Sequence, residues 1–273
     1  MRRLQSPVML ITLFTCLLAW NVVQARVQSA TVAQVGLEEK PGNVLPTNVK
    51  LTNHKGETVL SRDWLSQKKP VFLTLNYFRC STICDKMLFD LSRAIRDVEW
   101  APGEGYKVVT ISIDPKEDAK EAAKKRDQVF AIADLKEETA DWEFLTGSEE
   151  EVRKIANAVG YKYAYDAKTD QWGHPAVFMM LSSEGKVMGY RQGLSINSRD
   201  LEFSLVEAGE GKIGSLADQL VVSCYQYDDE EGAYVPFAWG VMRVGGALTV
   251  LFLGGFLAVM FRGERRKNRG EVV

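Results

Sequence analysis

Short apolar runs alternate with amphipathic stretches through the middle of the chain. Residues 70–77, 107–113 and 142–145 are nearly continuous apolar runs, which is typical of strands buried on both faces of a sheet. Between them, apolar residues recur at helical spacing over 85–98, and 117–133 is rich in Ala, Lys and Glu. The pattern therefore predicts strands joined by helices.

The same alternation continues toward the C-terminus. Ser148, with Glu151 three residues later, predicts a capping box at the start of another helix. Strands are predicted at 176–181 and 187–191, joined by a Glu-Gly turn, and a last helix is predicted at 198–208. The order β-α-β-α-β-α-β-β-α indicates an α/β layer fold over residues 70–210. Ahead of it, residues 26–69 form an N-terminal extension that contains a short hairpin.

The first 25 residues have the pattern of a secretory signal peptide. Arg2 and Arg3 precede an apolar run over 8–19, and Val23-Gln24-Ala25 offers a small-residue cleavage site. An uncleaved N-terminal anchor is the alternative. The signal peptide predicts that the following domain is exported.

A second apolar segment lies near the other end. Residues 244–261 carry no charge, and 236–261 is long enough to predict a transmembrane helix after a linker at 211–235. The basic segment 262–273 that follows predicts a cytoplasmic tail. We therefore expect residues 26–235 on the exported side of a cell inner membrane, tethered by one span.

The net charge of the predicted exported part limits the classes of molecule that it is expected to bind. Residues 26–235 hold 26 Lys and Arg against 34 Asp and Glu, a net charge of −8. This balance argues against nucleic acid as a partner. It suits a cationic or metal-delivering partner, although solubility alone explains it as well.

Two of the four cysteines form the central chemical motif. Cys16 leaves with the predicted signal peptide, and the remaining Cys80, Cys84 and Cys224 are an odd number, which predicts one reactive pair and one spare thiol. Cys80 and Cys84 follow a buried strand, and their i, i+4 spacing puts both thiols on one side of a helix start, where the helix dipole favours thiolate. Such a pair either cycles between dithiol and disulfide or binds a soft metal.

One histidine is the candidate third ligand. His174 lies in Gly173-His174-Pro175, directly before a predicted strand. In thioredoxin-like folds a proline at this place, usually cis, faces the cysteine turn, so we expect His174 to face Cys80 and Cys84. Thiolates select Cu(I) and zinc, and an added imidazole also permits Cu(II).

These motifs together resemble the Sco/SenC family. The resemblance rests on the C-x3-C of Cys80 and Cys84, the Ile-Ser-Ile-Asp-Pro run ending at Pro115, the Leu-Thr-Gly step at 145–147 and the placement of His174. It covers roughly residues 70–208. The chain departs from the family pattern at Ser81 and Asp85, where proline is common or usual, and in having its predicted anchor at the C-terminus.

The resemblance implies a thioredoxin-like fold that binds copper, as Cu(I) or Cu(II), through Cys80, Cys84 and His174. It implies a metallochaperone that serves the copper site of cytochrome c oxidase subunit II or a similar receiving protein. The alternative is a thiol-disulfide oxidoreductase with Cys80 as attacking and Cys84 as resolving thiol. A copper or redox sensor is disfavoured because only twelve residues follow the predicted span.

Overall fold

The computed structural model describes most of the chain between residues 34 and 270. The described residues are 34–65, 69–80, 82–100, 102–103, 105–135, 141–209, 222, 225–228, 233–236 and 238–270. The predicted signal peptide and Cys224 lie outside them.

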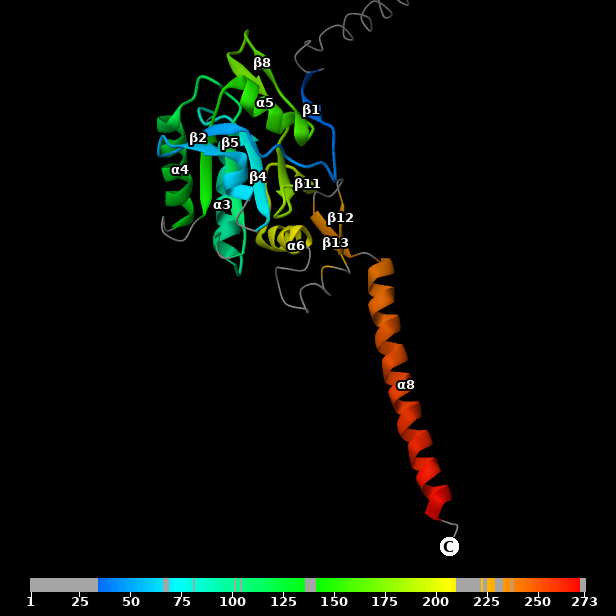
Figure 1. The fold of residues 1–273 in the computed structure, drawn as a ribbon. Coiled ribbons are helices and arrows are strands. Elements are labelled where there is room, and N and C mark those ends of the chain that lie inside the picture. Colours follow the sequence, from blue (N-terminus) through cyan, green and yellow to red (C-terminus); the bar gives the residue numbers. More distant parts are fainter. Residues whose placement is uncertain are drawn as a thin grey trace, which may run out of the picture.

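A seven-stranded mixed sheet forms the centre of the domain (Figure 1). Its three middle strands are parallel, and the strands outside them run antiparallel to their neighbours. In spatial order the strands are β11 (Val187–Gln192), β10 (Val177–Leu181), β4 (Val71–Asn76), β5 (Lys107–Ser112), β6 (Trp142–Thr146), β2 (Lys50–Asn53) and β3 (Thr58–Leu60). The predicted α/β layer fold and the N-terminal hairpin are confirmed.

Helices cover both faces of this sheet, which explains why β4 and β5 are apolar along their length. One face packs on α3 (Ile83–Asp97), α4 (Ala119–Ala133) and α6 (Ser198–Ala208). The other packs on α2 (Ser61–Leu65) and α5 (Glu149–Ala158). Every residue of β4 and β5 is buried, as expected of strands enclosed between two helical layers.

The helix caps differ from the prediction in one respect. The Ser148 side chain accepts from the Glu151 backbone N–H, but the Glu151 carboxylate accepts from the Lys50 backbone N–H at 2.7 Å and does not complete a capping box. The complete capping box lies at α4, between Asp118 and Glu121. The Ser-x-x-Glu motif does not by itself predict a capping box, because the glutamate carboxylate accepts a hydrogen bond from whichever backbone N–H the tertiary fold brings near.

Two small strand pairs were not predicted, and both lead to the candidate site. β1 (Gly36–Leu37) pairs with β7 (Tyr161–Lys162), and β8 (Ala164–Asp166) pairs with β9 (Gln171–Gly173) in a hairpin directly before His174. These strands are only two or three residues long, too short for a periodic pattern to reveal them.

The predicted linker at 211–235 contains a hairpin that docks on the domain. β12 (Tyr225–Asp228) pairs with β13 (Ala233–Pro236). The Phe203 ring on α6 lies 5.1 Å from the rings of both Tyr225 and Tyr234, and Tyr234 Oη donates to Glu207 at 2.6 Å. Part of the predicted linker is therefore a strand pair whose Tyr225 and Tyr234 side chains pack on α6.

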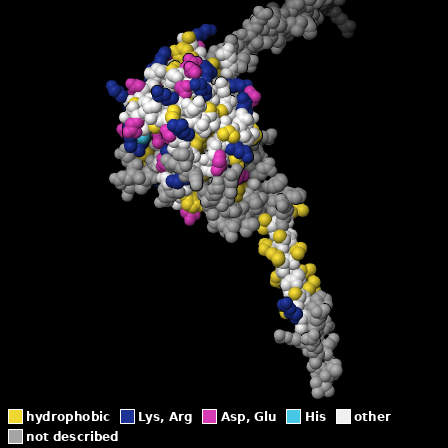
Figure 2. Space-filling model, in the orientation of Figure 1, with side chains coloured by type: hydrophobic (Ala, Val, Ile, Leu, Met, Phe, Trp, Pro, Cys, Tyr) yellow, Lys and Arg dark blue, Asp and Glu magenta, His cyan; other side chains and the backbone are white. Residues whose placement is uncertain are grey.

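The C-terminal helix α8 (Ala238–Gly270) runs through both the predicted span and most of the basic tail. Figure 2 shows hydrophobic side chains exposed along it. Phe252, for example, is 76% exposed. Within the residues whose placement is described, no helix is long and apolar enough to cross a membrane, so the predicted transmembrane helix is not confirmed.

Candidate functional site

The cysteine pair lies where β4 leads into α3. After Asn76 the chain turns, and the Cys80 N–H donates to the Tyr77 carbonyl at 3.3 Å. α3 begins only at Ile83, so Cys84 is on the helix while Cys80 precedes it. The expectation that both cysteines share the first helical turn was therefore wrong. Both are buried and both are free thiols.

The sheet brings His174 to this turn. β10 runs antiparallel to β4, so the segment before β10 meets the end of β4. The Cys84 Sγ lies 3.1 Å from His174 Nε2. The β8–β9 hairpin delivers His174 there without the cis proline that we expected, since no cis peptide bond occurs in the described part of the chain.

A buried tyrosine orients the imidazole. Tyr161 Oη lies 2.8 Å from His174 Nδ1, 2.7 Å from the Leu75 carbonyl and 3.0 Å from the Pro175 carbonyl. Burial raises the pKa of Tyr161 well above its ordinary value, so the hydroxyl keeps its single proton. His174 Nδ1 also lies 3.1 Å from the Pro175 carbonyl, an oxygen that can only accept, and Tyr161 has the Leu75 carbonyl as acceptor for its own proton. We therefore assign the Nδ1–H tautomer, which leaves the Nε2 lone pair toward Cys84.

The two thiols have opposite acidities. A hydrogen bond from Cys84 lowers the pKa of Cys80 to about 4, and the same hydrogen bond together with burial raises the pKa of Cys84. Burial lowers the pKa of His174, so its imidazole is neutral at physiological pH. The site thus contains a thiolate, a thiol whose proton has both the Cys80 sulfur and His174 Nε2 as acceptors, and a neutral imidazole.

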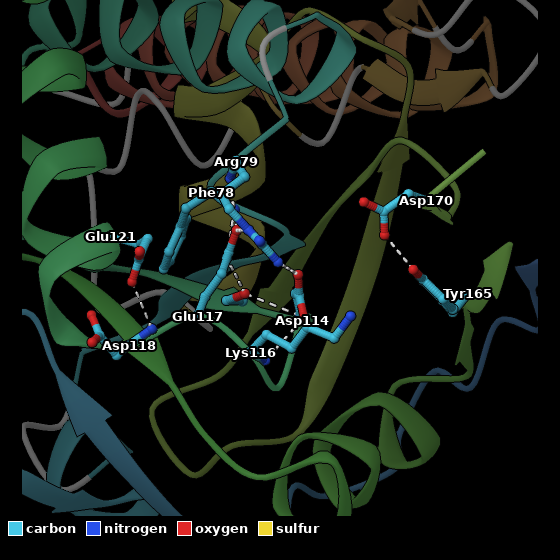
Figure 3. Close-up of polar contacts among 10 residues, drawn as sticks. Phe78, Arg79, Asp114, Lys116, Glu117, Asp118, Glu121, Tyr165 and Asp170 are labelled. Atoms are coloured by element: carbon cyan, nitrogen blue, oxygen red, sulfur yellow. Dashed lines mark hydrogen bonds and ion pairs between the residues drawn. The ribbon is translucent and has the colours of Figure 1, made fainter. Parts of the chain in front are cut away.

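A buried carboxylate holds the turn in place, as Figure 3 shows. Glu117, whose side chain is fully buried, accepts from the backbone N–H groups of Phe78 and Arg79, each at 2.7 Å. The Ser112 hydroxyl also donates to it at 2.5 Å. Sequence reasoning missed Glu117. The available signal was an acidic residue two positions beyond the Asp114-Pro115 strand stop, but nothing local shows that it faces another loop.

Ion pairs tie the same turn to neighbouring elements. The Arg79 guanidinium pairs with Asp114 and lies 3.4 Å from Glu117 (Figure 3). On α3, Asp85 pairs with Lys125 of α4, and Lys125 Nζ lies 3.5 Å from the Cys80 carbonyl. Asp85, one of the two residues at which the chain departs from the Sco/SenC pattern, therefore links α3 to α4 beside the cysteines.

Two clefts flank Cys80. One of about 270 Å³ is bounded by the aromatic residues Tyr77, Tyr165 and Trp172 together with Arg79, Cys80, Thr82, Asp114, Lys116, Thr169, Asp170 and Gln171. The other, of about 430 Å³, is lined by Phe78, Arg79, Cys80, Asp85, Lys120, Glu121, Lys124, Lys125 and Gln128. Cys80 is therefore approachable from two sides, although the residue itself is only 8% exposed.

The donor set suits a soft metal, but a three-ligand cluster is not assembled. A thiol and an imidazole at 3.1 Å are donors of the kind that copper prefers. In the described residues, no group of three or more His, Cys, Asp or Glu side chains is arranged to hold a metal ion. The structure brings together Cys84 and His174 and leaves Cys80 beside them in the turn.

Comparison with solved structures gives the same fold in several proteins. A candidate electron transfer protein from Aquifex aeolicus VF5 aligns with a TM-score of 0.55 and 20% identity, over 62% of this chain and 94% of that one. A candidate electron transport protein from the same organism gives a TM-score of 0.52 at 20% identity, over 62% and 98%. Arabidopsis thaliana ScoI with copper bound gives 0.50 at 19% identity, over 62% and 98%.

Sequence comparison settles the family. No curated protein matches the chain. The family model described as SCO1/SenC, however, matches residues 38–202, which include the cysteine turn, Glu117, Tyr161 and His174. Because this match spans more than half of the chain, the protein belongs to the SCO1/SenC family.

Proposed function

We propose that this protein is a copper metallochaperone that binds one copper ion through Cys80, Cys84 and His174. It passes the ion to the copper site of cytochrome c oxidase subunit II or a similar receiving protein. The observation that carries the proposal is the 3.1 Å approach of Cys84 Sγ to a buried imidazole. The copper-bound structure of the Arabidopsis thaliana relative supports it.

The chemistry of the three side chains fits copper as cargo. Cys80 supplies a thiolate without losing a proton, because its pKa is about 4. Cys84 must release its proton when the metal binds, so copper binding releases one proton and copper transfer to a receiving protein takes one up again. His174 offers its Nε2 lone pair as a neutral donor. A site with few ligands is open to invasion by the ligands of a receiving protein.

The test compares the two histidines of the chain. The full-length protein in detergent, reduced and then loaded with Cu(I) or Cu(II), is analysed for metal content and absorption, as wild type, His174→Ala and His54→Ala. We expect about one equivalent of copper in wild type and His54→Ala, and a thiolate-to-Cu(II) band that is lost in His174→Ala. Full copper retention in His174→Ala would contradict the proposal.

A second function is favoured by the unequal acidities of the two cysteines. A thiolate at Cys80 beside a protonated Cys84 is the arrangement of a thiol-disulfide oxidoreductase. Cys80 attacks one sulfur of a partner disulfide and the other sulfur leaves as thiolate. The Cys84 thiol, losing its proton, then attacks the Cys80 sulfur, which leaves the Cys80–Cys84 disulfide and the reduced partner. His174→Ala separates the two functions, because it removes copper binding but spares disulfide reduction.

We also propose that the domain is exported and held at a cell inner membrane by the apolar part of α8. The supporting observation is the row of exposed hydrophobic side chains from Met242 to Met260. Alkaline extraction of membranes from expressing cells tests retention, and protease treatment of intact spheroplasts tests sidedness. Release of the full chain by alkali, or protection of the domain from external protease, would contradict this location.

A further inference from the structure

The cleft of about 430 Å³ beside Cys80 has an unusual charge for this protein. Its wall is the first two turns of α4, and Arg79, Lys120, Lys124 and Lys125 line it. Its two acidic lining residues are Asp85 and Glu121. We call it the cationic cleft.

Most of these charged side chains already form ion pairs or hydrogen bonds within the domain. Arg79 pairs with Asp114 and Glu117, and Lys125 pairs with Asp85. Glu121 is bound to the backbone N–H of Asp118, as Figure 3 shows.

Lys120 and Lys124 differ from these residues. Both are exposed, and among the residues that the structure describes neither forms an ion pair within 4.0 Å, although Lys120 attracts the Asp118 carboxylate at longer range. Two positive charges are therefore available to a ligand in the cleft.

The positive charge of the cleft is opposite in sign to the net charge of the surrounding protein. Residues 26–235 carry a net charge of −8, so the bulk of the predicted exported part repels anions. A concave site of opposite sign concentrates anions where the field lines converge. Cys80 also lines this cleft. An anion drawn into the cleft is thus brought to the reactive sulfur of the site.

We propose that the cationic cleft is a recognition site for anionic sulfur ligands, in which Lys120 and Lys124 bind carboxylates next to the thiol or disulfide that meets Cys80. A small acidic disulfide and an acidic segment around a partner's cysteine share this chemistry. The inference rests on the proposed thiol-disulfide exchange at Cys80. It adds the class of ligand with which Cys80 exchanges.

The experiment measures mixed-disulfide formation at Cys80 without copper. The reduced full-length chain, with Cys16 and Cys224 replaced by Ser, is mixed at low salt with disulfides of different charge. These are glutathione disulfide (anionic), bis(2-hydroxyethyl) disulfide (neutral) and cystamine (cationic). Cys80 thiolate attacks one sulfur of the probe and the second sulfur leaves as thiolate. If Cys84 then attacks the Cys80 sulfur, the Cys80–Cys84 disulfide forms and the remaining half of the probe leaves as a second thiolate. The rate is therefore followed by released thiol, and mass distinguishes the mixed disulfide from the internal disulfide.

Charge-reversal variants identify the lysines responsible. The double variant Lys120→Glu/Lys124→Glu is compared with Lys120→Ala/Lys124→Ala, and with Lys55→Glu/Lys186→Glu as the matched control. Lys55 and Lys186 are exposed lysines in the β2–β3 and β10–β11 turns. The control therefore makes the same change in net charge at sites that do not line the cleft.

In Lys120→Glu/Lys124→Glu we expect the reaction with the anionic probe to be about tenfold slower at low salt, and the reaction with the cationic probe to be faster. The rates of Lys120→Ala/Lys124→Ala should lie between those of this variant and wild type. The neutral probe should change by less than about twofold. The difference between probes should shrink as salt is raised. The proposal is overturned if the control pair has the same effect, or if all three probes slow equally.

Peptide probes separate the two sources of the ligand. A ten-residue peptide with an activated cysteine among four Asp residues is compared with the same peptide carrying four Asn. If the lysine variants slow the reaction with the Asp peptide but not the reaction with glutathione disulfide, the ligand is an acidic polypeptide. If they slow the reaction with glutathione disulfide but not the reaction with the Asp peptide, the ligand is a small acidic disulfide. Copper content is measured separately in each variant, so a failure of the metallochaperone proposal is distinguished from a failure of the cleft.

Discussion

Cys84 Sγ and His174 Nε2 lie 3.1 Å apart although ninety residues separate them in the chain. The contact arises because β10 begins beside the end of β4 and because α3 starts just before Cys84. The geometry of the site therefore depends on the side chains that hold these segments together.

Tyr161→Phe removes one hydroxyl from beneath the imidazole while keeping the ring. We expect the preference of His174 for the Nδ1–H tautomer to weaken, because the substitution removes Tyr161 Oη, 2.8 Å from Nδ1, and leaves the Pro175 carbonyl at 3.1 Å as acceptor. Copper affinity should fall by about 10- to 100-fold, as is typical for loss of a hydrogen bond that orients a metal-binding histidine. Nitrogen-15 NMR of the copper-free protein measures the tautomer.

Tyr163→Phe is the control for that experiment. The Tyr163 hydroxyl is buried and has no hydrogen-bond partner in the described part of the structure. Its removal should leave the His174 tautomer and copper affinity unchanged. Equal effects of the two substitutions would mean that the hydroxyl of Tyr161 does not orient His174.

Cys80 should remain reactive in mildly acidic solution. Because the Cys84 hydrogen bond holds the pKa of Cys80 at about 4, its alkylation rate should follow a thiolate midpoint near that value. In Cys84→Ala the hydrogen bond is lost, and the midpoint should move toward the ordinary cysteine value of about 8.5. Iodoacetamide labelling between pH 3 and 9, followed by peptide mapping, measures both midpoints.

The same acidity has a consequence for stability. The folded pKa of Cys80 lies below the unfolded value, so its contribution is fully present above the unfolded pKa and is lost as the pH falls toward about 4. The free energy of unfolding of wild type relative to Cys80→Ser should therefore rise with pH between roughly 4 and 8.5. A pH-independent difference in denaturant unfolding would show that the thiolate is not stabilised by the fold.

Glu117→Gln should destabilise the cysteine turn. A carboxylate accepts from the Phe78 and Arg79 N–H groups together, whereas an amide has only one acceptor oxygen and presents an NH2 group to the other donor. An unsatisfied buried group costs about 1–3 kcal/mol, and we expect a loss of that order in the free energy of unfolding. Amide NMR shifts should change at Phe78 and Arg79.

Glu150→Gln provides the comparison for Glu117→Gln. The Glu150 side chain is 81% exposed and, within the described part of the chain, pairs with Lys154 on the surface of α5. Its replacement should change the free energy of unfolding by less than about 0.5 kcal/mol. If Glu117→Gln were equally mild, the buried carboxylate would not be what holds the turn.

Gly160→Ala should disturb the segment that carries Tyr161. Gly160 has φ +68°, and a Cβ there would lie 1.7 Å from the Glu38 carbonyl oxygen. The left-handed backbone alone costs an L-residue about 1–2 kcal/mol, and the clash adds to it by forcing β1 away from β7. We expect a lower melting temperature and weaker copper binding.

Gly36→Ala is a matched control on β1, because a Cβ at that position meets no atom within 4 Å. It should leave melting temperature and copper binding close to those of wild type. Should Gly160→Ala behave in the same way, the β1–β7 pairing would have no part in positioning Tyr161.

The sequence by itself determined the layered fold and the chemistry of the site. Continuous apolar runs at β4 and β5 require two covered faces, and helical periodicity supplies the helices that cover them. These signals are local, because each is a repeat along one segment. The cysteine spacing and the histidine before β10 are likewise readable from the chain.

Only the tertiary structure decided how these residues meet. It placed Cys80 before α3 rather than on it, paired β12 with β13 in the predicted linker, and brought Glu117 and Tyr161 to the site. The physical reason is that a buried carboxylate or hydroxyl is satisfied by whichever donors and acceptors packing brings near. No pattern along a single segment records those partners.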